Sequence, residues 1–124
     1  MPLTTTAKNT MLDALANTVY VAFFSGGNPG DSGASEVDPA TLWGSGNRPA
    51  VTLAAASSGT RSPSGDASLG TVAVSSQAVT SIAYYDAATA GNLLGYAAYS
   101  RTFVSGDVVS IPDANDVFTT SDPA

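Results

Sequence analysis

The chain has 124 residues, a formal net charge of −6 from four basic and ten acidic side chains, and neither cysteine nor histidine. Without cysteine there is no disulfide, thiolate metal site or thiol nucleophile, and without histidine a Ser-His-Asp hydrolase cannot be assembled. The basic residues are scattered along an acidic chain, whereas phosphate binding needs them clustered. The sequence therefore predicts a protein that is not an enzyme, uses no cofactor and binds no nucleic acid.

The length predicts a single domain over residues 1–124, since about 100–200 residues is usual for one domain. Charged residues make up 11% of the chain, against about 25% in typical soluble domains. A surface so poor in charge suits a protein that is packed among other subunits, which favours a homo-oligomer. No apolar run reaches the roughly 18 residues of a membrane span. The N-terminus lacks a secretory signal, so synthesis in a cytoplasm is expected.

Residues 1–17 are expected to form an N-terminal arm and one short helix. Apolar side chains recur on one face of this segment, at Ala7, Met11, Leu12 and Leu15. A helix of about three turns is marginal alone in water. We therefore expect it to dock on the rest of the chain or on a neighbouring subunit.

A strand is predicted at 18–25, because this segment is β-branched and aromatic throughout. It is followed by a long glycine-rich loop, 26–47. Loops of this length in compact proteins are usually functional or disordered. Leu42 and Trp43 near its end have the character of an anchor that holds the loop against a surface.

The rest of the chain reads as short strands separated by turn signals. Strands are predicted at 48–54, 68–74, 80–86, 93–99, 101–104, 108–111 and 116–119, with a polar stretch at 57–67 and an extended C-terminal tail at 112–124. Short strands at this spacing are typical of a sandwich or barrel rather than of alternating βα units. The predicted fold is all-β, an antiparallel β-sandwich (Ig-like or jelly-roll-like) of about seven or eight strands with one short N-terminal α-helix.

Four passages resemble a known family. They are the helix around 11–15, the strand 19–24, the glycine-rich loop that closes on 48–52, and the run 82–97 followed by 104–109. The last is the most specific, because a strand, an Asp-initiated turn, a Gly-Asn corner, a second strand and a Gly-Asp hairpin occur there in register. The chain resembles the small β-sandwich virion proteins of tailed bacteriophages, described as tail-fibre-like, minor tail or minor capsid proteins. The resemblance implies a structural part of a phage particle, in its head or its tail.

Aromatic residues supply most of the candidate partner-binding side chains. Alternation along a strand puts Tyr84 and Tyr85 on opposite faces, and likewise Phe23 and Phe24, so one of each pair is expected in the core and the other exposed or at an interface. The outward member either packs against its own domain or contacts another subunit. Trp43 either binds a partner, as tryptophan often does at interfaces, or covers its own sandwich. The candidate partner-binding residues are Trp43, Leu42, Tyr85, Tyr99, Phe24 and Arg48.

Two groups of oxygen-bearing side chains have the composition of a cation site. They are Asp113, Asn115 and Asp116 in the tail, and Asp31, Glu36 and Asp38 in the long loop. The tail group lacks the glycine and glutamate spacing of an EF-hand. Solvated turns are the preferred interpretation, and no metal site is predicted.

The functional hypothesis is a capsid decoration or cement protein on the outer surface of the head. Its partners would be the major capsid protein or other virion proteins, a trimer is the favoured oligomer, and the virion would be assembled in the host bacterial cytoplasm. The alternative is a tail-fibre or baseplate module that binds a host receptor or glycan.

Overall fold

The computed structural model describes residues 4–14, 17–65, 67–111 and 118–119. In chain order its elements are α1 (Thr5–Asp13), β1 (Thr18–Ser25), β2 (Ser35–Glu36), α2 (Pro39–Trp43), β3 (Ala50–Thr52), β4 (Thr60–Arg61), β5 (Ala67–Thr71), β6 (Ser76–Tyr85), β7 (Leu93–Val104), β8 (Val108–Ile111) and β9 (Phe118–Thr119). All of the strand pairs are antiparallel. The predicted all-β, antiparallel sandwich is confirmed. Neither helix of the described part is long and apolar enough to cross a membrane.

The larger sheet has the strand order β2-β1-β6-β7, and β3 pairs with β1 on the same side as β2. Strand β1 is central and runs antiparallel to β6, with Phe23 opposite Ile82. Alternate residues of β1 point into the core, because side chains of a strand alternate between its faces. Val19, Val21 and Phe23 are accordingly no more than 1% exposed.

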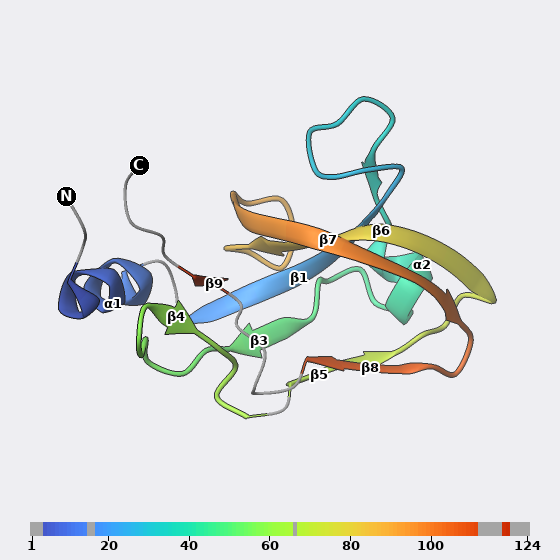
Figure 1. Cartoon of the computed structure of the whole chain (residues 1–124). Coiled ribbons are helices and arrows are strands. Elements are labelled where there is room, and N and C mark those ends of the chain that lie inside the picture. Colours follow the sequence, from blue (N-terminus) through green and yellow to red (C-terminus); the bar gives the residue numbers. More distant parts are fainter. Residues whose placement is uncertain (1–3, 15–16, 66, 112–117, 120–124) are drawn as a thin grey trace.

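The second layer is the antiparallel pair β5–β8, which lies across the core from the larger sheet (Figure 1). Both layers contribute to one apolar core. Its buried members are Val19, Val21, Phe23, Leu42, Val51, Leu53, Leu69, Val72, Val79, Ile82, Tyr84, Phe103, Val109 and Ile111. A smaller cluster of Ala22, Phe24 and Ala83 lies on the other face of β1 and β6. The central strands are therefore covered on both faces, in keeping with the β-branched and aromatic composition of 18–25.

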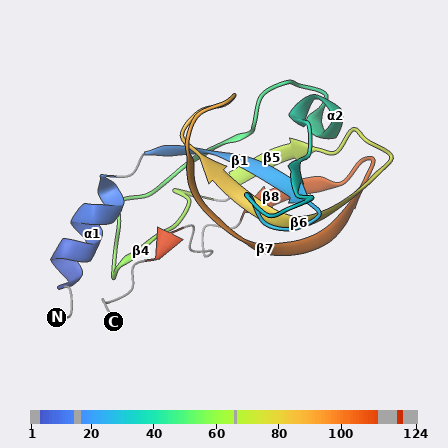
Figure 2. The same cartoon turned by 90° about the horizontal axis from the view of Figure 1, so that it is seen from above.

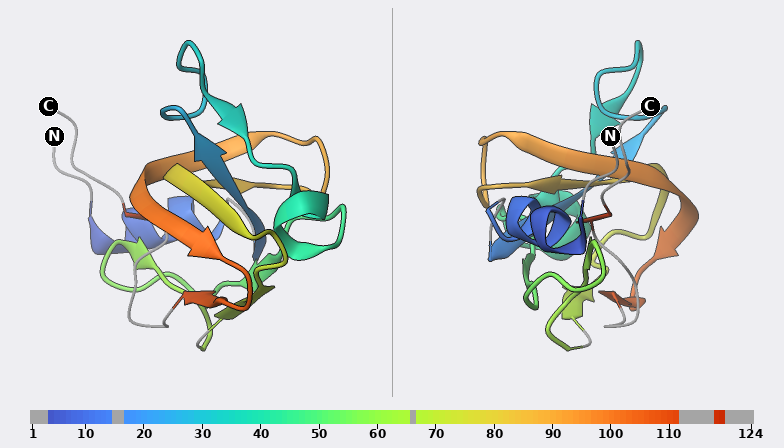
Figure 3. Two further views of the ribbon diagram at one scale, coloured as in Figure 1. Left: turned by 90° about the vertical axis from the view of Figure 1, so that its right-hand side faces the viewer. Right: turned by 60° about the vertical axis from the view of Figure 1, so that its left-hand side comes forward.

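The region 26–47 was expected to be one long loop, and this expectation is wrong in its second half. Strand β2 and helix α2 form there, leaving a hairpin tip at 26–34 that projects from the sandwich (Figure 3). Helix α2 has ordinary start and stop signals: the Asp38 carboxylate accepts a hydrogen bond from the Ala40 N–H, Pro39 occupies the first turn, and Gly44 ends the helix with φ 77°. Glycine content concealed these signals.

The predicted strands 93–99 and 101–104 are one continuous strand, β7. Two register shifts against β6 place an extra residue in β7, and such bulges bend a strand instead of ending it. Strand β4 lies within the predicted polar stretch 57–67 and pairs with β9. The predicted strand 116–119 and the predicted tail 112–124 lie mostly outside the described residues. Their described part is strand β9.

Helix α1 stands beyond one end of the sandwich (Figure 2). Its predicted apolar face is only partly correct, since Leu12 is buried but Met11 is 54% exposed, and Leu15 lies outside the described residues. Polar contacts decide the orientation of the helix. The Asn9 side chain accepts a hydrogen bond from the Gly59 N–H, and the Asp13 carboxylate accepts one from the N–H of residue 56.

Candidate functional site

Three of the candidate partner-binding residues lie in or against the main core. Leu42 is 1% exposed. The Trp43 ring centroid lies 6.2 Å from that of Phe23 and 6.4 Å from that of Phe103, and the Tyr99 ring lies 5.4 Å from Phe23. Helix α2 thus places Leu42 and Trp43 over the end of their own sandwich. A contact of these side chains with a partner stays a prediction.

The other three candidates meet on the opposite face of the larger sheet. Phe24 is only 7% exposed and belongs to the smaller apolar cluster, against which Tyr85 packs. The Arg48 guanidinium carbon lies 3.8 Å from the centroid of the Tyr85 ring, a cation–π geometry. Tyr84 points into the main core, so the predicted alternation of the tyrosine pair is correct. The structure therefore brings together Arg48, Tyr85 and Phe24.

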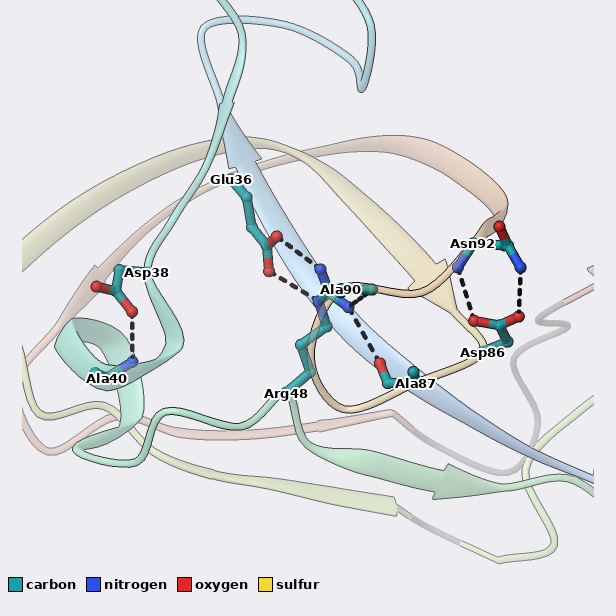
Figure 4. Close-up of polar contacts among 8 residues, drawn as sticks. All are labelled: Glu36, Asp38, Ala40, Arg48, Asp86, Ala87, Ala90 and Asn92. Carbon is teal, nitrogen blue, oxygen red and sulfur yellow. Dashed lines mark hydrogen bonds and ion pairs between the residues drawn. The ribbon is translucent and has the colours of Figure 1, made fainter.

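Arg48 also ties three segments of the chain together, in an arrangement that we call the Arg48 latch (Figure 4). Its Nε and Nη2 each donate to one carboxylate oxygen of Glu36 at 2.9 Å. Its Nη1 donates to the carbonyl oxygens of Ala87 at 3.1 Å and Ala90 at 2.6 Å. The two-pronged pairing fixes both the position and the plane of the guanidinium. Arg48 thereby holds the β6–β7 turn against β2.

The electrostatics of the latch follow from this geometry. The hydrogen bonds to Glu36 raise the pKa of Arg48, and burial opposes this shift, so the guanidinium remains charged. Burial raises the pKa of Tyr85, and the nearby Glu36 charge acts in the same direction. A shallow hollow of about 170 Å³ lies beside the latch, lined by Pro39, Gly46 and the turn at 88–90 as well as by the ion pair. Its charged groups are largely satisfied by one another.

The turn that the latch holds is closed by a second set of hydrogen bonds. One Asp86 carboxylate oxygen accepts the Asn92 N–H at 2.7 Å, and the other accepts the Asn92 side-chain amide at 3.0 Å. These bonds lower the pKa of Asp86, the backbone one most. Ala90 has φ 51° and Gly91 φ 78°, and a Cβ on Gly91 would lie 2.5 Å from the Asp86 carboxylate. The predicted Asp-initiated turn with a Gly-Asn corner is thus present and is closed by its own hydrogen bonds.

The acidic residues of the predicted long loop have separate structural partners. Glu36 pairs with Arg48, Asp38 caps α2, and the Asp31 carboxylate accepts a hydrogen bond from the N–H of residue 28. No group of three or more metal-ligating side chains gathers within the described residues. The tail group at 113–116 lies outside the described residues.

Sequence reasoning missed three exposed large apolar side chains on β7, one of which, Val104 at the end of the strand, is 47% exposed. Leu93 is 42% exposed and Tyr96 is 52% exposed. The neighbours of Tyr96 in the sequence, Gly95 and Ala97, give no sign of which face of the strand is covered. The strand order supplies that information, because β7 lies at the end of the larger sheet.

The geometry describes a rigid β-sandwich whose buried charges serve to hold its own loops. A search of curated proteins finds no match. A protein-family model described as "Podophage GP4 fiber I protein gp80" matches residues 2–119, which is nearly the whole chain. This match agrees with the resemblance of the sequence to virion proteins of tailed phages. The chain belongs to the podophage fiber I protein family and is a tail-fibre-like structural protein of a phage virion.

Proposed function

We propose that this protein is a non-enzymatic subunit of the phage tail fibre, which acts by building and presenting a surface. The observation that carries the proposal is the family match over residues 2–119, whose description names a fibre protein. The latch is consistent with this role. Its charged groups, Arg48 and Glu36, are bonded to each other and to a turn, as suits a structural building block.

The capsid-decoration role stays the second candidate, with the major capsid protein as its partner. It is supported by the low share of charged residues, 11%, which suits repeated packing against a shell. Trp43 supports it less than the sequence indicated, because α2 turns this side chain towards Phe23 and Phe103.

Copy number and position in the particle separate the two roles. We expect quantitative mass spectrometry of purified virions to give from about three to a few dozen copies per particle, in keeping with the symmetry of fibres. Gold-labelled antibodies against the chain should decorate the tail. Hundreds of copies, with label spread over the head, would establish the decoration role in place of the fibre role.

Activity and assembly are tested on the same particles. A fibre subunit that only builds and presents a surface should release no reducing ends from host surface polysaccharide, whereas release that depends on this chain would show an enzyme.

We also propose assembly in the host cytoplasm. Fractionation of infected cells before lysis should place the chain there, in tail-sized intermediates.

A further inference from the structure

In the part of the chain that the structure describes, strand β7 leaves one edge of the larger sheet open. It has 12 residues and pairs with β6 along one side. Within the described residues no strand pairs with its other side. Such an edge presents a row of backbone N–H and C=O groups that can bond to another strand.

The usual protections of an edge strand are sparse along β7. Residues 93–104 contain no proline and a single charge, Arg101. That charge lies near the end of the strand, where its Nη2 is 3.7 Å from the Asp107 carboxylate and its guanidinium carbon is 5.0 Å from the centroid of the Phe103 ring. The two bulges bend β7, but the residues between them, 95–98, are in regular register with β6. This neutral central stretch is open to pairing.

The opposite edge of the sheet cannot serve as the matching partner. It consists of β2 and β3, which have two and three residues. The backbone beyond β3 is already in use, because the Ser64 N–H donates to the Thr52 carbonyl and Leu53 forms a bridge with Pro63. A partner strand should be about as long as the free edge of β7. Among the described strands, β7 of a second copy meets this condition.

We propose that two copies of this chain pair through their β7 edges, antiparallel and about a two-fold axis at Ala97. This register places the exposed ring of Tyr96 opposite Ala98 of the partner subunit, and the symmetric contact repeats it. Tyr96 is 52% exposed and Ala98 is also exposed, so a large side chain meets a small one. The backbone bonds supply affinity and the Tyr–Ala contacts fix the register. The inference does not depend on the fibre role.

The absence of native cysteine makes a direct test possible. In this register Ala97 faces Ala97 of the partner subunit, with a Cα–Cα separation of about 4.5–5.5 Å, which is within disulfide range. Ala97→Cys should therefore form a disulfide-linked dimer on mild oxidation. Ser100→Cys, on the same exposed strand, is the matched control. In this register the two copies of residue 100 lie six residues apart along the strands, about 20 Å at ~3.3 Å per residue, and should stay unlinked. Linkage of Ser100→Cys but not of Ala97→Cys would overturn the register.

Sedimentation of the full chain, from about 1 µM to about 1 mM, tests the pairing itself. We expect a monomer–dimer equilibrium that Tyr96→Lys weakens by at least about tenfold, since a charge on a strand edge opposes pairing. Val108→Lys, at a side chain 68% exposed on β8, is the control and should leave the equilibrium unchanged. Circular dichroism checks that each variant is folded. A trimer, a monomer at every concentration, or cross-linking only to another virion protein would overturn the proposal.

Discussion

At the residue scale, two of the four basic side chains are buried and hold distant parts of the chain together. Arg48 is 8% exposed and Arg61 is 2% exposed. A buried guanidinium must find acceptors for its N–H groups, since an unpaired charge in the interior is costly. Arg48 finds them on Glu36 and on the turn after β6. Charges are scarce in this sequence, and these two are used for internal structure.

Removal of the Arg48 side chain should destabilise the fold. Arg48→Ala leaves the Glu36 carboxylate and two turn carbonyls without their donor, which we expect to lower the free energy of unfolding by about 2–4 kcal/mol. Arg101→Ala is the matched control, because its ion pair with Asp107 is 40% and 28% exposed and should contribute less than about 1 kcal/mol. Urea unfolding measures both. Equal effects of the two substitutions would contradict a structural role for the latch.

The Asp86–Asn92 contact should respond to acid. Its hydrogen bonds lower the native pKa of Asp86. Its stabilising effect is therefore complete at pH above the ordinary aspartate pKa and is lost as the pH falls through the lowered native value. A carbon-13 NMR titration should place the Asp86 midpoint below the ordinary value, and Asn92→Ala should raise it part of the way, since the backbone bond remains. Asn28→Ala, in the projecting hairpin, should leave the midpoint unchanged.

At the scale of elements, α1 shows how polar contacts can outweigh an apolar pattern. The spacing of Met11, Leu12 and Leu15 predicted the buried face, yet Met11 is exposed. The carbonyl oxygen of Leu12 instead accepts a hydrogen bond from Nη1 of Arg61 at 3.1 Å. Nε of Arg61 also lies 3.8 Å from the Asp13 carboxylate. Arg61 also donates to the carbonyl of Ala54, seven positions away, but its contacts with Leu12 and Asp13 join positions 49 and 48 apart, beyond the reach of any local pattern.

Asp13→Ala should loosen α1 without unfolding the sandwich. The substitution removes the 2.7 Å hydrogen bond that the Asp13 carboxylate accepts from the N–H of residue 56, and also the contact with Arg61. The loss of about 1–2 kcal/mol outweighs the roughly 0.3–1 kcal/mol gained by removing an acidic charge from a helix C-terminus. Hydrogen exchange in α1 should therefore speed up by about tenfold, with β1 and β6 still protected. Met11→Ala, on the exposed face, is the control, and equal acceleration by both variants would contradict this account.

At the scale of the whole molecule, one core joins both layers and α2. Trp43 connects the two layers. Its ring packs against Phe23 of β1 and Phe103 of β7 in the larger sheet, and it also contacts Gly70 of β5 in the second layer. A Cβ on Gly70 would lie 3.2 Å from the Trp43 ring. Glycine at this position therefore lets the second layer approach the tryptophan.

Trp43→Ala should consequently weaken the whole sandwich. We expect the free energy of unfolding to fall by about 2–4 kcal/mol, somewhat less than for a fully buried tryptophan because Trp43 is only partly buried. Urea unfolding followed by far-ultraviolet circular dichroism measures it. Val108→Ala, at a side chain 68% exposed, should change it by less than about 1 kcal/mol. An unchanged stability of Trp43→Ala, with assembly lost, would instead establish Trp43 as a partner anchor.

The sequence by itself determined the features that depend on neighbouring residues or on composition. The strand at 18–25, the opposite faces of Tyr84 and Tyr85 and the corner at Gly91 follow from side-chain alternation and from turn chemistry, which are local. The absence of cysteine and histidine excluded whole classes of chemistry.

The tertiary structure decided which distant segments meet. Arg48 finds Glu36 12 positions away and the Ala90 carbonyl 42 positions away. The tertiary structure also assigned Leu42, Trp43 and Phe24 to apolar clusters and, among the residues it describes, left the outer edge of β7 without a paired strand. These features depend on strand order, and no local periodicity encodes strand order, because it results from the packing of all the strands at once.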